Sequence, residues 1–84
     1  MPTQRFVVRS AADLGRTIAQ ARHLLGTTQT DLAAETGMAR DYLSRLEGGM
    51  QTLQLERTFM ALRALGVQLE AHLTYEPDEA GDDG

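Results

Sequence analysis

The sequence contains no cysteine among its 84 residues. Without thiols the chain can form neither a disulfide framework nor a thiolate metal site, and it has no cysteine nucleophile. Small secreted domains usually need disulfides for stability, so this absence favours the cytoplasm. Long apolar runs are absent as well: the first residues lack the hydrophobic stretch of a signal peptide, and no segment is long enough to cross a bilayer. We therefore expect a soluble, cytoplasmic protein.

Residue groups that support catalysis or cofactor binding are also missing. His23 and His72 fall on different predicted elements without acids at ligand spacing, which argues against a metal site or a general base. The aromatic residues are too scattered for a base-stacking platform, and there is no Gly-rich phosphate loop or Ser/His/Asp pattern. A chain of 84 residues supports one compact domain. We expect a binding module and not an enzyme, with no cofactor, metal, small-molecule substrate or membrane partner.

Lysine is absent too, since all eight basic residues are arginines. The net charge is −4, but five of the twelve acids fall in residues 76–84, EPDEAGDDG. That segment has no base and no large apolar side chain, so it cannot bury enough apolar surface to fold. We predict a globular domain over residues 1–75 and a disordered acidic tail over 76–84. Eight arginines against seven acids leave the predicted domain close to neutral.

A helix is predicted over residues 11–25. Ser10 is suited to cap its start, and Asp13 three residues later completes a variant of the capping box. Gly26 follows as a left-handed C-terminal residue. The apolar residues recur at helical spacing and define one apolar stripe: Leu14, Ile18, Ala21 and Leu25.

Three further helices follow, each closed by glycine. Thr28 caps the first, which ends at Gly37. The second covers residues 39–47 and ends at Gly48-Gly49, and the third covers 54–65 and ends at Gly66. The last helix carries another predicted apolar stripe, made of Leu55, Phe59, Leu62 and Leu65.

Residues 67–75, VQLEAHLTY, alternate between apolar and polar side chains, which predicts a half-buried strand. Its one candidate partner within the chain is the extended stretch RFVVR at 5–9, and a lone two-stranded ribbon is marginal in water. An exposed apolar strand also invites pairing from another chain. We therefore predict that this strand joins two protomers in a two-fold homodimer. Its apolar residues are Val67, Leu69, Ala71, Leu73 and Tyr75.

The two short helices between residues 28 and 47 meet the requirements of a helix-turn-helix. Ala33 supplies a small inner side chain and Gly37 supplies the turn. With Leu43 and Leu46 facing inward, the second helix keeps outward residues for the major groove of DNA: Ala39, Arg40, Asp41, Ser44 and Arg45. The start of the first helix offers N–H groups and short polar side chains to a phosphate, from Thr28, Gln29 and Thr30.

Residues of about 14–67 resemble the Cro/phage-repressor (XRE-type) helix-turn-helix family. The resemblance rests on Arg22, TQTDLA, GMARDYLSRLEGG and LRALGV, which follow one another in the family's order. It implies a mainly α, lambda-repressor-like domain of four to five helices, here with short N- and C-terminal β-strands used in dimerisation. It also implies a dimeric, sequence-specific transcriptional repressor that binds the palindromic half-sites of a double-stranded DNA operator.

The strands before the first helix and after the last one also resemble the layout of HipB-type antitoxins of bacterial toxin–antitoxin operons. This likeness implies that the protein autoregulates its operon and binds a toxin, a HipA-type kinase. The alternative is a protein-interaction module that neutralises a toxin or kinase without reading DNA. The near-neutral charge of residues 1–75 favours that alternative.

The family pattern implies roles for single residues of the DNA face. Gln29 would contact the phosphate backbone, and Arg40, Asp41 and Ser44 would lie near base edges, with Arg40 placed for a bidentate contact to guanine. Arg45 would reach either a phosphate or a base. Asp41 would either accept from a cytosine amine or pair with Arg45 at i,i+4.

Two further positions follow from the same pattern. Arg22 and Glu47 would form a structural salt bridge that ties the first helix to the end of the recognition helix. Ala39, where the family often has a polar residue, would contribute only its N–H group.

Overall fold

The computed structural model of the chain describes residues 1–50 and 52–76. Along the chain it contains β1 (Thr3–Val8), α1 (Ala11–Leu25), α2 (Gln29–Thr36), α3 (Arg40–Glu47), α4 (Leu53–Leu65) and β2 (Leu69–Thr74). The predicted mainly helical domain with a strand at each end is thereby confirmed. Apart from Glu76, the predicted acidic tail lies outside the described residues.

Local hydrogen bonds explain why the helices start and stop where they do. The hydroxyl groups of Ser10, Thr28 and Thr52 each accept a hydrogen bond from an N–H group in the first turn of α1, α2 and α4. Gly37 closes α2 with a φ of 77°, in the left-handed region that side chains disfavour. The α3 helix differs, because Ala39 at its N-cap provides no side-chain hydrogen bond.

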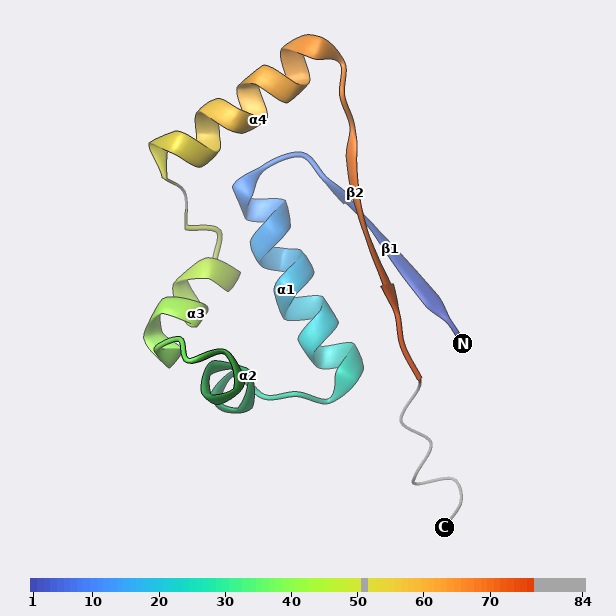
Figure 1. The fold of residues 1–84 in the computed structure, drawn as a ribbon, viewed down its shortest axis with the longest axis vertical. Helices are drawn as coiled ribbons and strands as arrows, with labels where there is room; N and C mark the ends of the chain where they lie inside the picture. The colour runs from blue at the N-terminus through green and yellow to red at the C-terminus, as the bar shows by residue number, and fades with distance from the viewer. Residues whose placement is uncertain (51, 77–84) are drawn as a thin grey trace.

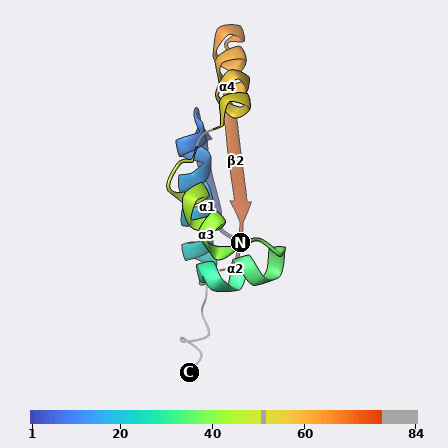
Figure 2. The same ribbon diagram turned by 90° about the vertical axis from the view of Figure 1, so that its left-hand side faces the viewer.

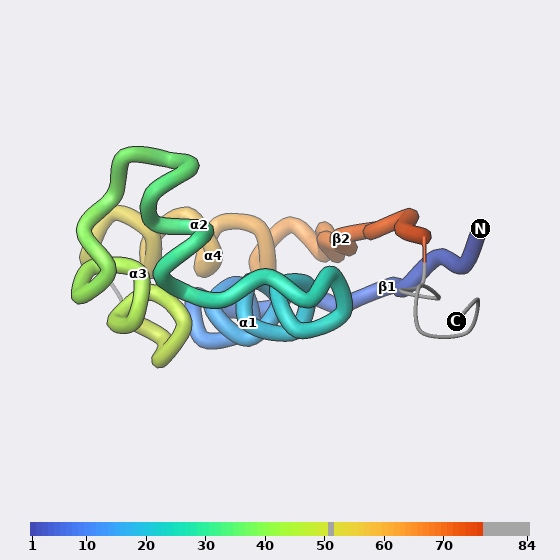
Figure 3. The backbone as a smooth tube through the Cα atoms, turned by 90° about the horizontal axis from the view of Figure 1, so that it is seen from below, coloured from blue at the N-terminus to red at the C-terminus, as the bar shows by residue number. Residues whose placement is uncertain are grey.

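Helix α1 lies in the middle of the molecule, with the other helices and both strands around it (Figure 1). Helices α2 and α3 lie on one side of α1, the two strands on the other, and α4 crosses near its N-terminal end. Seen from the side, most of these elements form one narrow layer from which α2 projects (Figure 2). The view from below again places α1 between the α2–α3 pair and the strands (Figure 3).

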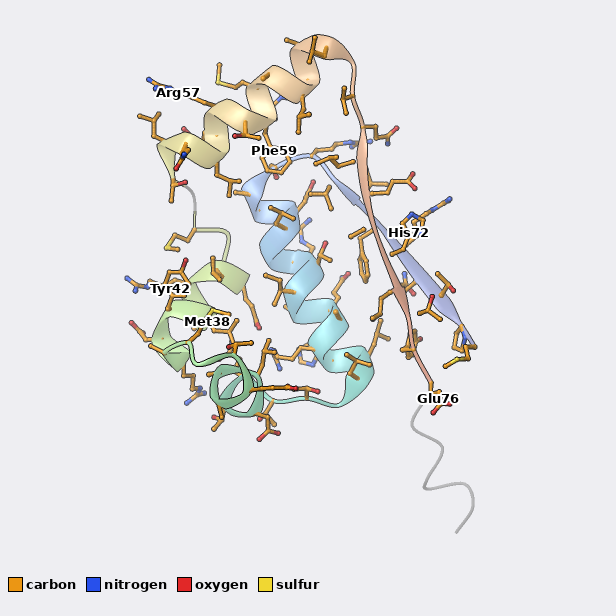
Figure 4. All side chains as sticks on the ribbon, viewed as in Figure 1. Met38, Tyr42, Arg57, Phe59, His72 and Glu76 are labelled. Atoms are coloured by element: carbon orange, nitrogen blue, oxygen red, sulfur yellow. The ribbon has the colours of Figure 1, made fainter. Side chains whose placement is uncertain are left out.

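The core of this layer is small. Within residues 1–50 and 52–76 five apolar residues are buried, namely Val8, Ala11, Ala33, Leu43 and Phe59, and Leu43 alone among them is fully enclosed. Phe59 points from α4 toward the start of α1 (Figure 4).

The two predicted apolar stripes are exposed at their C-terminal ends. Leu25 at the end of α1 is 51% exposed, and Leu65 at the end of α4 is 76% exposed. Helical spacing shows which face these residues share, but it does not show whether another element covers them.

Strands β1 and β2 pair antiparallel along their whole length, from Thr3 opposite Thr74 to Val8 opposite Leu69. Residues directly opposite each other share a face of the sheet. One face therefore collects the apolar pairs Val8–Leu69 and Phe6–Ala71, and this face turns toward α1. The predicted strand 67–75 is shorter in the structure, where Val67 and Tyr75 flank it and the Tyr75 N–H donates to the Pro2 carbonyl.

Gly15 sets how closely α1 and α3 approach. It is buried in the middle of α1, and a Cβ atom there would overlap the carbonyl oxygen of Leu46 at the end of α3. The carbonyl of Glu47 lies 3.1 Å from the same point. Since these neighbours are backbone atoms, they cannot move without displacing the end of α3.

We expect Gly15→Ala to destabilise the protein, although the same change in an open helix stabilises it by about 0.8–1.0 kcal/mol. The overlap with Leu46 should reverse that gain and lower the free energy of unfolding by about 1–3 kcal/mol. Urea unfolding followed by circular dichroism measures the change. Gln20→Ala, an exposed change in the same helix, is the control and should stay within about 0.5 kcal/mol of the parent. A Gly15→Ala variant as stable as the parent would contradict the close approach.

Candidate nucleic-acid interface

Helices α2 and α3 pack against each other around a tight turn. Ala33 is buried on the inner face of α2, and the Met38 N–H donates to the Ala33 carbonyl across the turn at 3.1 Å. On α3, Leu43 is 0% exposed and holds the inner side of the helix in the core. The inner sides of α2 and α3 are therefore packed in the core, and their outer sides are exposed.

The outer side of α3 carries the residues predicted to face DNA. All five are exposed: Ala39, Arg40, Asp41, Ser44 and Arg45. Tyr42, which the sequence did not assign, is also exposed, but it lines a separate groove with Met50 and Leu55 at the start of α4. In Figure 4 it lies on the side of α3 away from α1. Tyr42 therefore lies at the edge of the polar outer face of α3, on the side toward α4.

An ion pair holds the C-terminal end of α3. Arg22 on α1 donates to both carboxylate oxygens of Glu47, from Nε at 2.7 Å and from Nη2 at 2.9 Å. The Arg22 side chain is 11% exposed and that of Glu47 is 8% exposed. The remaining Arg22 nitrogen, Nη1, donates to the Thr27 carbonyl at 3.0 Å. A bidentate pair of this kind fixes orientation as well as distance.

Gln29 joins this ion pair. Its Nε2 donates to Glu47 Oε1 at 3.0 Å, so the network includes one side chain from each of α1, α2 and α3. The family pattern assigned Gln29 to the phosphate backbone alone, and the spacing of residues 29 and 47 gave no signal of this contact. One of the amide's hydrogen-bond donors is therefore already engaged inside the protein.

The network shifts the pKa values of both charged groups. The hydrogen bonds from Arg22, supported by the one from Gln29, lower the pKa of Glu47 below its ordinary value, although partial burial opposes the shift. The hydrogen bonds to Glu47 likewise raise the pKa of Arg22. Both residues are thus held in their charged forms.

The start of α2 is exposed on both sides of Gln29. The Thr28 hydroxyl accepts from the Asp31 N–H at 3.0 Å, so it caps the helix, while Thr30 lies exposed on the first turn. The first N–H groups of α2 and the half-buried Gln29 therefore lie together at one end of the helix-turn-helix.

Asp41 lies within reach of Arg45 on the outer face of α3. Arg45 Nη2 is 3.9 Å from Asp41 Oδ2, and the two side chains are 61% and 87% exposed. A pair this long and this exposed contributes little to stability. The structure thus contains the i,i+4 pair, held loosely enough that either side chain can turn to a ligand.

Membrane-spanning helices and metal-binding groups are both absent from the described residues. No helix among them is long and apolar enough to cross a membrane. Within residues 1–50 and 52–76 there is no group of three or more His, Cys, Asp or Glu side chains placed to hold a metal ion.

A short helix pair with one buried side, one exposed polar side and a fixed C-terminal end defines a helix-turn-helix DNA-binding domain. The chain belongs to the Cro/phage-repressor (XRE-type) helix-turn-helix family, because the family's model, Helix-turn-helix, matches residues 18–71. No curated protein and no solved structure matched the chain. The family match supports a DNA-binding transcription regulator.

We expect Glu47→Gln to lower the free energy of unfolding at pH 7 by about 1.5–3 kcal/mol, because it removes the charge that Arg22 faces. The lowered pKa of Glu47 means that its stabilisation is present above the ordinary carboxyl pKa of about 4.3 and is lost as the pH falls further. The parent should therefore lose more stability on acidification below about pH 4 than the variant does.

Urea titrations at several pH values measure this difference. Glu35→Gln, which removes an exposed carboxylate from α2, is the matched control and should follow the parent. Equal acid sensitivity of the parent and Glu47→Gln would show that the ion pair does not stabilise the fold.

Proposed function

We propose that the protein is a sequence-specific transcriptional repressor that binds DNA as a homodimer. The observation that carries the proposal is the exposed outer face of α3, backed by buried Leu43 and by the Arg22–Glu47–Gln29 network. A rigid support of this kind lets a few side chains approach base edges in one defined orientation. The near-neutral charge of residues 1–75 means that affinity must come from such placed contacts more than from net charge.

In this proposal Arg40 and Ser44 read base edges, and Arg45 reaches a phosphate or a base. Arg40 opens α3, and its guanidinium suits the two acceptors of guanine in the major groove. Thr28, Gln29 and Thr30 bind a phosphate at the start of α2. Gln29 does this with the part of its amide that Glu47 does not use.

The dimer in this proposal forms through the outer edge of β2. Strand β1 covers one edge of β2 along its whole length, which leaves the other edge for a second copy. Antiparallel pairing of two β2 strands gives a four-stranded sheet with a two-fold axis perpendicular to it. Figure 1 shows α3 on the α1 side of the strands. Rotation about this axis would keep both recognition helices on that side, as two half-sites of one operator require.

We also propose that the protein is an antitoxin that represses its own operon in the cytoplasm and binds a HipA-type kinase toxin. The support is the layout, in which β1 and β2 flank a helix-turn-helix. Co-purification of the full chain with the product of the neighbouring gene tests this part. A neighbouring gene that encodes no kinase would remove the antitoxin role and leave the repressor role intact.

The second candidate function is a protein-interaction module that neutralises a toxin or kinase without reading DNA, and the near-neutral domain charge favours it. A gel shift with the DNA upstream of the protein's own gene separates the two functions. We expect a shift at low salt from the full chain and from a chain ending at Tyr75. No shift from either protein would exclude the repressor.

We expect Arg40→Ala to relax specificity at one base pair of each half-site, by about 1–3 kcal/mol, because it removes a bidentate contact. Fluorescence anisotropy with single-base variants of the bound DNA, at one salt concentration, measures the discrimination. Arg5→Ala removes the same charge from the outer face of the sheet and is the control. If Arg40→Ala discriminates among the variants as well as the parent, Arg40 does not read a base.

We expect Asp41→Asn to strengthen binding to cognate and unrelated DNA alike, because it removes a negative charge that repels phosphates and competes for Arg45. Anisotropy titrations with both DNA types measure the two affinities. The opposite result, a loss confined to cognate DNA, would identify Asp41 as a reader of cytosine.

A further inference from the structure

Two exposed leucines end the two longest helices of the protomer. Leu25 is the last residue of α1 and Leu65 is the last residue of α4. Both belong to stripes whose other members are buried or half-buried, yet they are 51% and 76% exposed. Removing apolar surface from water is favourable, so a surface that covers both leucines would be favoured.

Leu25 and Leu65 lie near opposite ends of strand β2. The last turn of α1 packs beside the first half of β1, since Gln4, Phe6 and Leu24 line one groove, and Gln4 is opposite Leu73 near the end of β2. Leu65 is separated from the start of β2 by three residues, Gly66, Val67 and Gln68. Figure 1 shows both helix ends on the α1 side of the strands, with α4 at the upper end and the C-terminus of α1 at the lower end.

A two-fold axis between the midpoints of two paired β2 strands sets the start of each strand beside the end of the other. When two β2 strands pair antiparallel over their full length, Leu69 of one copy lies opposite Thr74 of the other. The end of α4 in one copy is thereby carried to the end of α1 in the other. The axis is perpendicular to the sheet, so both helix ends stay on the same side of it.

We propose that Leu65 of each copy docks on Leu25 of the second copy, so that the dimer has two symmetric apolar contacts beside the joined sheet. The proposal rests on the β2 pairing proposed above and identifies the surface that completes it. Exposed Val67 and Leu69 connect Leu65 to the edge of β2, which makes the contact continuous with the strand interface. A second copy of the chain covers these leucines, because the two-fold axis of the β2 pairing brings Leu65 of one copy to Leu25 of the other.

The opposite flank of α4 provides a built-in control. Met60 is also exposed, but at 100° per residue it lies about 140° around the helix from Leu65. Met60 lines a groove with Glu56 of α4 and with Ser10, the N-cap of α1. This groove lies away from the edge of β2. The proposed contact therefore involves Leu65 and excludes Met60.

Cysteine cross-linking of the full chain tests this contact without background, because the natural sequence has no cysteine. An equimolar mixture of Leu25→Cys and Leu65→Cys proteins, oxidised with glutathione disulfide, should give a disulfide-linked dimer on a non-reducing gel. Each variant oxidised alone should stay mainly uncrosslinked, because a disulfide needs Cα atoms within about 7 Å. A mixture of Leu25→Cys and Met60→Cys is the control and should also stay uncrosslinked.

The outcomes separate this contact from the proposed function. Sedimentation of the reduced proteins reports the dimer, and a gel shift reports DNA binding. A dimer that binds DNA but gives no Leu25–Leu65 cross-link overturns the docking contact alone. Cross-linking of Leu65→Cys to itself would also overturn it, since that requires a different two-fold axis. A reduced protein that is monomeric overturns the β2 dimer and the docking contact together.

Loss of the leucine side chain gives a second, independent measurement. Leu65→Ala should raise the dimer dissociation constant at least tenfold by sedimentation equilibrium, whereas Met60→Ala should change it less than twofold. Equal effects of the two substitutions would contradict the contact. If the toxin covered Leu65 instead, Leu65→Ala would weaken toxin binding and leave the dimer unchanged, and the proposal would be wrong.

Discussion

The ion pair between Arg22 and Glu47 is the interaction on which the rest of this structure depends. It connects α1 to the last residue of α3, and Gln29 extends it to the start of α2. Gly15 allows the end of α3 to come close enough for the pair to form. Because both charges are largely shielded from water, losing one partner leaves the other poorly solvated. The orientation of α3, and therefore the direction of its outer face, is determined by this network.

Helix α3 is anchored by the buried Leu43 and by the Arg22–Glu47 ion pair. Its outer face carries exposed Arg40, Ser44 and Arg45, while α4 has one buried residue, Phe59, and one hydrogen bond from Arg63 to the Arg9 carbonyl. A chain with a net charge of −4 gains little from attraction to phosphate at long range. Specific DNA binding then requires two well-placed recognition helices, which makes the proposed dimer a part of the function and not an addition to it.

Local signals in the sequence were sufficient for the helix ends and the turn. Ser10, Thr28 and Gly37 act where they were expected because caps and left-handed turns depend on neighbouring residues alone. The exposure of Leu25 and Leu65 could not be predicted, because helical spacing says which face a residue occupies and not whether a neighbour covers it. The roles of Gly15 and Gln29 were missed because they depend on contacts between residues that are far apart in sequence.

Selection of bound sequences from a random double-stranded DNA library tests the central claim most directly. A dimer that presents two α3 helices about one two-fold axis should enrich an inverted repeat, with half-site centres about 34–36 Å apart or a multiple of that distance. Enrichment of a single unrepeated site, or of no sequence at all, would contradict the account.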